Sequence, residues 1–221
     1  MIRLLVILFL ILHPVIFFGQ VQPYPLHQQA EDFLNSLDAK QLARVQFHMT
    51  DPTRFNWHYV PPTQSPRDGL PLREMSAVQQ EKCMALLKLF LSEQGFERTK
   101  GIMSLEDILK VLEPDNPSRI PGNYFVTVYG DPSKDKVWAW KFSGHHIALN
   151  YTVVDGQVAF APFFFGANPD IVKDGPRKGY QVLKEEEELG FQLVNGLDEA
   201  QLKQAMVVEL LGCKCAIVFF A

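Results

Sequence analysis

The chain of 221 residues is 47% hydrophobic and 12% aromatic, enough for one globular domain with a full apolar core. Its 21 lysines and arginines are outnumbered by 25 aspartates and glutamates, and the formal net charge is −4. Because nucleic-acid affinity depends largely on clustered basic side chains, this composition leads us to exclude a nucleic acid as the partner.

The first twenty residues differ in composition from the rest of the chain. Arg3 provides a positive start, residues 4–18 are apolar apart from His13-Pro14, and Gly19-Gln20 precedes a polar stretch. This order is typical of a secretory signal peptide, and the apolar run is shorter than the ~20 residues that span a bilayer. We expect a signal peptide over 1–20, a single domain over 21–221, a secreted or periplasmic protein, and no stable membrane span after leader removal. An uncleaved inner-membrane anchor is the alternative.

Helix starts recur along the chain with one chemical signature. An N-cap residue is followed three positions later by glutamine at Asp38/Gln41, Ser76/Gln79 and Asp198/Gln201, which predicts capping boxes. Ser104 with Asp107 predicts a fourth start. The likeness of "NSLDAKQL" to "NGLDEAQL" is interpreted as shared capping chemistry, not as a duplicated module. Helices are expected over 26–37, 39–47, 77–94, 105–112, 179–194 and 199–210.

Between these helices the composition changes: aromatic and β-branched residues predominate, and residue types alternate with a period of two. Strands are expected over 124–129, 137–142, 145–154 and 157–165. Asp155-Gly156 is a strong two-residue hairpin turn, and Ser143-Gly144 predicts another. The pattern therefore predicts an α+β fold, an antiparallel β-meander of about four strands with helices on both sides in sequence.

The first hairpin determines which side chains share a face. A turn at Ser143-Gly144 would pair Phe142 with His145, Trp140 with Ile147 and Trp138 with Leu149, all on one apolar face. The opposite face would carry Ala139, Lys141, His146, Ala148, Asn150 and Thr152. Small residues among polar ones, beside the phenylalanines of the next strand, predict the floor of a pocket.

The adjacent histidines suggest a metal ion but cannot hold one alone. At ~3.3 Å per strand residue, His146 and Asn150 lie about 13 Å apart, so any further ligand must come from another element. A helical period places Glu187 in the middle of an apolar stripe, where a carboxylate is either paired or functional. We predict Glu187 as the third member with His145 and His146. The alternatives are a salt bridge from Glu187 to Arg67 or Lys141, and a His145 ring packed on Phe142.

Several motifs between about residues 34 and 204 resemble one protein family. They are "FNWHYVPP", "PRDGL", "YFVTVYGDP", "WAWKFSGHHIALN", "FFFGANP" and "GPRKGYQVLKEEEEL", and they resemble the family catalogued as domain of unknown function 3500. The family has no established activity, so the resemblance implies no reaction. It implies signature positions at Trp57, Arg67, Trp138, Trp140, Gly144, His145, His146, Asn150, Gly166, Asn168, Pro169 and Glu187. Its members generally continue further, so the resemblance implies a C-terminally truncated domain here.

Two functions from different classes follow. The first is a secreted enzyme, a metal-assisted hydrolase with a divalent metal as its possible cofactor, in which His145, His146 and Glu187 act as ligands or acid–base groups. The residues expected to bind its substrate are Lys141, Asn150, Asn168, Trp138, Trp140 and Arg67. The second is a non-catalytic binding module in which Trp57, Trp138 and Trp140 form an aromatic recognition surface for a small molecule or polymer. Exposed tryptophans favour binding, and buried ones favour a core wall.

Overall fold

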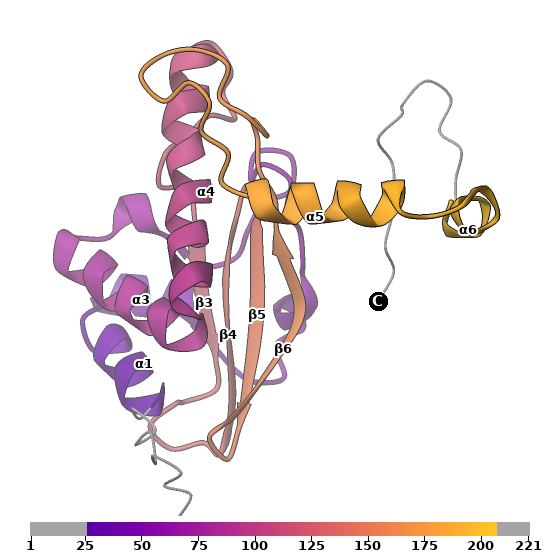
Figure 1. Ribbon diagram of the computed structural model, residues 1–221. Helices are drawn as coiled ribbons and strands as arrows, with labels where there is room; N and C mark the ends of the chain where they lie inside the picture. The colour runs from indigo at the N-terminus through magenta and orange to yellow at the C-terminus, as the bar shows by residue number, and fades with distance from the viewer. Residues whose placement is uncertain (1–25, 207–221) are drawn as a thin grey trace, which may run out of the picture.

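The computed structural model describes residues 26–206 and contains a sheet with three helices against one face (Figure 1). The helices are α1 (Leu26–Leu34), α2 (Ala39–Val45), α3 (Ala77–Phe90), α4 (Glu93–Leu112), α5 (Lys184–Asn195) and α6 (Glu199–Ala205), with 3-10 turns η1 (Pro52–Phe55) and η2 (Leu72–Glu74). Helices α1, α3 and α4 cover the sheet, whereas α5 and α6 extend away from it. No helix within 26–206 has both the length and the apolar character needed to cross a membrane.

All three predicted capping boxes are present. Asp38, Ser76 and Asp198 each accept a hydrogen bond from the N3 backbone, and the N3 glutamine bonds back to the cap. The predicted start at Ser104 is wrong, because α4 begins after the N-cap Ser92 and continues through Ser104. There the Ser104 hydroxyl donates a hydrogen bond to the carbonyl of Gly101 at 2.6 Å. The hydroxyl thus has its hydrogen-bond partner within the helix, and Ser104 does not act as an N-cap.

The sheet confirms the α+β class but is larger than predicted. Its strands are β1 (Gln46–Phe47), β2 (Leu70–Pro71), β3 (Phe125–Tyr129), β4 (Val137–Gly144), β5 (Ile147–Val154) and β6 (Gln157–Phe165). The path β3-β4-β5-β6 is the predicted antiparallel meander, but β1 joins β3 in parallel and β2 joins it antiparallel. The expectation of a pure four-stranded meander is therefore wrong. The added strands have two residues each, too few for any periodicity.

The second hairpin turns where predicted, and the first does not. Val154 pairs with Gln157 around Asp155-Gly156, and both turn residues have positive φ, 47° and 79°, as a type I′ turn requires. In the first hairpin, Gly144 pairs with Ile147, so the turn consists of His145 and His146. The turn lies two residues further along the chain than predicted, so Phe142 pairs with Leu149 and not with His145, a shift of four positions in the pairing. Because an even shift keeps strand side chains on their faces, the faces of β4 and β5 are as predicted. The phenylalanines of β6 are not, since after a register shift Phe163 and Phe165 pair with Leu149 and Ile147 and lie on the apolar face.

The apolar face of the meander is the core of the protein. Trp138 and Trp140 are 2% and 0% exposed, and the ring of Phe90 on α3 lies 6.1 and 5.0 Å from theirs, centroid to centroid. Tyr151 of β5 stacks on Trp140 at 5.0 Å. Helix α3 is thus attached to the centre of the sheet through aromatic contacts.

Gly144, the last residue of β4, has no room for a side chain. A Cβ there would lie 2.9 Å from Cε1 of Tyr124 and 3.0 Å from the carbonyl oxygen of Asn123, and the Tyr124 ring is buried and stacked on Phe142. We expect Gly144→Ala to lower the free energy of unfolding by about 1–3 kcal/mol in urea titrations.

The matched control is Gly190→Ala in the middle of α5, where a Cβ would meet nothing within 4 Å. Alanine should stabilise this partly exposed helical position by about 0.5–1 kcal/mol. Equal effects of the two substitutions would contradict the described packing at the end of β4.

Candidate functional site

The two histidines form the tip of the β4–β5 hairpin, and two other segments hold that tip. The backbone of His146 has a φ of 58°, a left-handed conformation that costs a non-glycine residue conformational energy. Its N–H donates to the carbonyl of Tyr59 at 2.8 Å, and its carbonyl accepts from the N–H of Gly166 at 2.9 Å. A Cβ on Gly166 would lie 2.7 Å from Nδ1 of His146, so the "GANP" loop can approach only through its glycine.

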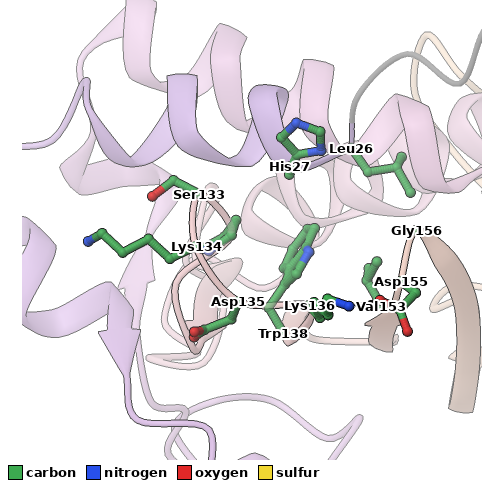
Figure 2. A pocket seen from close by; sticks show the side chains of 11 residues that line it. Leu26, His27, Ser133, Lys134, Asp135, Lys136, Trp138, Val153, Asp155 and Gly156 are labelled. Atoms are coloured by element: carbon green, nitrogen blue, oxygen red, sulfur yellow. Dashed lines mark ion pairs between the residues drawn. The ribbon is translucent and has the colours of Figure 1, made fainter.

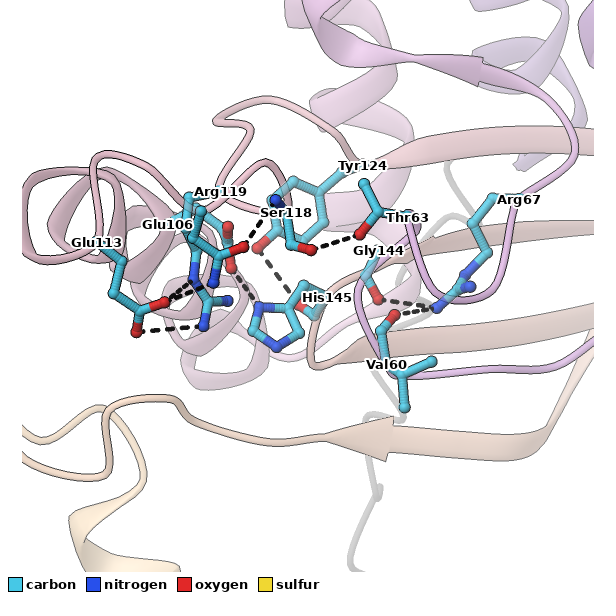
Figure 3. A network of polar contacts seen from close by, with 11 residues as sticks. Val60, Thr63, Arg67, Glu106, Glu113, Ser118, Arg119, Tyr124, Gly144 and His145 are labelled. Carbon is cyan, nitrogen blue, oxygen red and sulfur yellow. Dashed lines mark hydrogen bonds and ion pairs between the residues drawn. The ribbon is translucent and has the colours of Figure 1, made fainter.

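His145 is paired with a carboxylate on helix α4. Its Nδ1 donates a hydrogen bond to Oε1 of Glu106, and both side chains are almost completely buried, 7% and 5% exposed (Figure 3). The Tyr124 hydroxyl donates to the carbonyl of His145 at 3.4 Å. A buried carboxylate requires a partner, and the imidazole provides it. The helix-borne glutamate of this site is therefore Glu106.

Glu106 was missed because the sequence was interpreted as a helix starting at Ser104. In a first turn, the helix dipole stabilises a carboxylate, which then needs no further partner. In the longer observed helix, Glu106 lies on one stripe with Ile102, Leu105 and Leu109, all buried. This position within an apolar stripe is the sequence pattern that would have indicated Glu106 as a candidate site residue.

His146 lies against His145 and is held in its neutral form. The two rings meet edge to face with centroids 4.2 Å apart. Burial, with smaller contributions from the charges of His145 and Arg119, lowers the pKa of His146 to about 4. Lys141 is not among the groups that lower this pKa. The Nδ1 atom of His146 is buried and has no hydrogen-bond partner in the part of the chain that the structure describes, so a neutral imidazole with unused bonding capacity lies beside the Glu106–His145 pair.

A second ion pair, Arg119 with Glu113, lies next to His145 (Figure 3). Nε of Arg119 donates to Oε2 of Glu113 at 3.0 Å. Hydrogen bonds from Arg119 and Asn116 lower the pKa of Glu113. Arg119 is only 9% exposed, and its Nη1 has no partner among the described residues. Two acidic side chains near the histidines, Glu106 and Glu113, are therefore each paired with a basic one, His145 and Arg119.

The lowered pKa of His146 predicts an acid-sensitive fold. Because the folded pKa of about 4 lies below the ordinary 6.5, the neutral ring contributes fully above pH 6.5, and its contribution is lost as the pH falls towards 4. Part of the ring is solvent-exposed, so we expect a loss of about 1–2 kcal/mol, less than the full shift implies. His146→Asn should flatten the decline measured by urea unfolding at several pH values, since asparagine tolerates the left-handed backbone. The control His58→Asn, at an exposed histidine, should leave it unchanged.

Glu187 does not join the histidines. It is exposed on α5, and its Oε2 accepts a hydrogen bond from Gln181 at 3.2 Å, so neither Arg67 nor Lys141 is its partner. Within residues 26–206 no three histidine, cysteine, aspartate or glutamate side chains are grouped to hold a metal ion. The three-ligand set His145, His146 and Glu187 is therefore not assembled, and these residues do not fit a metal centre.

Arg67 fixes a loop against the end of β4. Its guanidinium donates to the carbonyls of His58, Val60 and Gly144 at 2.9, 2.7 and 3.4 Å, and also to that of Ser65. Burial lowers its pKa to about 10. These contacts assign Arg67 to holding residues 58–65, the segment that supplies the carbonyl of Tyr59 to His146. Asn168 lies two residues after Gly166, in the loop that leaves the tip.

The predicted pocket floor is divided between two places. Ala139, Lys141, Asn150 and Thr152 line a cavity of about 130 Å³ on the sheet face opposite the helices. His146 is not among its lining residues. The predicted floor thus contains a hollow in mid-sheet and, separately, the histidine tip.

The two tryptophans predicted to bind a substrate lie in the core instead of on a recognition surface. Trp140 is 0% exposed. Trp138 borders a cavity of about 410 Å³ (Figure 2). That cavity surrounds the Asp155-Gly156 turn, and the 8 residues of β5 separate it from the histidines by ~26 Å. It therefore does not belong to the histidine site.

Comparisons with known proteins agree with the resemblance noted in the sequence. The family model described as "Protein of unknown function (DUF3500)" matches residues 21–216. Searches of curated proteins and of solved structures gave no significant match. The resemblance is confirmed, and the chemistry must be argued from the site.

Proposed function

We propose that this chain is a hydrolytic enzyme whose acid–base group is His145. The chain belongs to the DUF3500 family of proteins of unknown function. One observation carries the proposal: His145 is bonded through Nδ1 to the buried carboxylate of Glu106. Enzymes commonly orient a catalytic imidazole with a carboxylate in this way.

The chemistry follows from the bond between the two side chains. An ionised carboxylate only accepts hydrogen bonds, so the proton of a neutral His145 stays on Nδ1 and the lone pair is on Nε2. Nε2 can then take a proton from water as its oxygen attacks a carbonyl carbon, and return that proton to the leaving group. His146, neutral because burial lowers its pKa to about 4, offers a second hydrogen-bonding ring beside it. No metal enters this scheme, because the predicted ligands do not converge.

The test is hydrolysis of a panel of chromogenic substrates: 4-nitrophenyl esters, anilides, phosphates and glycosides. For any substrate that the protein hydrolyses, His145→Asn and Glu106→Gln should each lower kcat/KM by roughly 100-fold or more. The control Asp107→Asn changes the exposed neighbour of Glu106 on α4 and should stay within about twofold. Circular dichroism verifies that each variant is folded. Full activity in folded His145→Asn would refute the proposal.

The alternative is a non-catalytic binding module, and exposed aromatic side chains favour it. Phe55 and Tyr59 are 73% and 42% exposed, and they would replace the buried tryptophans as the recognition surface. Retention on cellulose or chitin beads that is lost in Phe55→Ala with Tyr59→Ala, but kept in His145→Asn, would favour this function.

We also propose that the protein acts outside the cytoplasm. The support is the composition of residues 1–20, which lie outside the described residues. N-terminal sequencing of the exported protein should begin close to residue 21. Retention of Met1 in the mature protein would refute export by a cleaved leader.

A further inference from the structure

The cavity of about 130 Å³ on the outer face of the sheet has features that the histidine site does not explain. Its floor comes from β4 and β5, with Lys141 directly opposite Asn150 across the strand pair. Its walls come from Arg54 of η1 and from Ala161 of β6. Lys141 and His145 are four residues apart, about 13 Å at ~3.3 Å per residue, so the cavity is distinct from the tip.

Lys141 carries a buried charge that no carboxylate neutralises. The side chain is 6% exposed and forms no ion pair within the described residues. Its Nζ donates to the carbonyls of Thr53 and Asn56 at 2.7 and 3.1 Å. The ammonium also lies 5.4 Å from the centroid of the Tyr129 ring, so its partners are two carbonyls and a ring face, and none of them is an anion. An uncompensated buried cation is unfavourable, and an anion beside it would offset that cost.

Asp51 is close enough for its charge to interact with that of Lys141, but its carboxylate is used by another residue. Oδ1 of Asp51 accepts from the backbone N–H and from the hydroxyl of Thr53, at 2.9 and 2.5 Å. These bonds, more than Lys141, lower the pKa of Asp51. The carboxylate therefore caps η1 and leaves the ammonium unpaired.

A second cation faces the same cavity. Arg54 lines it, and its Nε is buried without a hydrogen-bond partner in the described part of the chain. The guanidinium lies over the ring of Phe55, 4.4 Å from the centroid, which holds it in place. Asn150 and Thr152 add an amide and a hydroxyl, and the lining includes neither aspartate nor glutamate.

An irregularity in the sheet lies beside this hollow. Between the pairs Leu149–Phe163 and Tyr151–Phe160, Asn150 alone on β5 stands opposite two residues of β6, Ala161 and Pro162. A bulge of this kind bends the strand and redirects side chains, and bulges are frequent next to binding sites. The small side chain of Ala161 lines the hollow beside Asn150.

We propose that this cavity binds a small oxyanion, a single carboxylate, sulfate or phosphate group, between Lys141 and Arg54, with Asn150 and Thr152 donating hydrogen bonds. A volume of about 130 Å³ corresponds to roughly four water molecules, which suits one such group. The anion is either free or the charged substituent of a larger molecule. The site does not depend on the activity of His145.

The test is titration calorimetry of the protein with sodium sulfate, phosphate and acetate, against sodium chloride at equal ionic strength. We expect saturable binding of at least one oxyanion, weakened about tenfold or more in Arg54→Gln and lost in Asn150→Asp, which places a negative charge in the cavity. The controls Lys178→Gln and Asn195→Asp make the same charge changes at exposed positions and should bind as the original chain does.

Lys141→Met should also abolish binding, but it removes the bonds to Thr53 and Asn56 as well, so Arg54→Gln and Asn150→Asp decide the outcome. Tighter binding of dextran sulfate than of free sulfate, at equal sulfate concentration and with no binding of neutral dextran, identifies a substituent on a polymer. Equal binding identifies a free anion. Binding no stronger than that of chloride, or binding unaffected by either deciding variant, would overturn the proposal.

Discussion

Glu106→Ala is expected to lower the free energy of unfolding by about 3–5 kcal/mol, because it leaves the buried His145 without its partner. The substitution creates a small cavity as well, and both effects act in the same direction. Urea unfolding at pH 7, followed by tryptophan fluorescence, measures the change. Glu106→Gln retains the shape and an acceptor oxygen, so a smaller loss is expected from it.

Asp107→Ala is the matched control for this prediction. Asp107 is the next residue on α4 and is exposed, so its replacement should change the free energy of unfolding by less than about 0.5 kcal/mol. Similar losses from both alanine variants would mean that Glu106 contributes only helix propensity, and the described pairing with His145 would be wrong.

Trp140→Ala is expected to lower the free energy of unfolding by about 3–5 kcal/mol. The side chain is 0% exposed and contacts Phe90 of α3 and Tyr151 of β5. Its removal leaves a cavity where the helical layer meets the sheet. Thermal unfolding and urea unfolding should agree on the loss.

Phe160→Ala provides the comparison on the same face of the sheet. Phe160 pairs across from Tyr151 on β6 but is 63% exposed, so its loss should cost less than about 0.5 kcal/mol. If Trp140→Ala were as stable as Phe160→Ala, the Trp140 side chain would not be buried in the core, and the core described above would be wrong.

Much of the fold was predictable because its signals are local. The capping boxes at Asp38, Ser76 and Asp198 and the turn at Asp155-Gly156 depend only on residues a few positions apart. The faces of β4 and β5 were also predictable, since alternation survives an even shift of register. The bulge in β6 was not, and it moves Phe163 and Phe165 to the apolar face. Strands β1 and β2 were not, because each has two residues and exists only by pairing with β3.

The turn of the first hairpin was mispredicted because long-range contacts decide it. Ser143-Gly144 has the better turn chemistry, yet Ser143 pairs with Phe125 of β3 and thereby extends β4. His145 is then drawn to Glu106 on α4, and His146 takes the left-handed conformation. None of these partners is adjacent in sequence.

Only the histidines of the candidate site were predictable, because their carboxylate partner is distant in sequence. The unusual "GHH" stretch pointed to His145 and His146, but its carboxylate partner lies 39 positions away in sequence. Glu187 had the stronger local pattern, an apolar stripe in a short helix, and the structure leaves it exposed. Only the contact between α4 and the hairpin tip distinguishes the two glutamates.

The central claim, a buried Glu106–His145 pair at the hairpin tip, is tested most directly by imidazole ¹H–¹⁵N nuclear magnetic resonance of the folded protein. We predict a far-downfield proton on Nδ1 of His145, protected from solvent exchange and lost in Glu106→Ala, while Asp107→Ala leaves it in place. A His145 ring whose Nδ1 proton exchanges freely, or whose signals are the same in Glu106→Ala, would contradict the account.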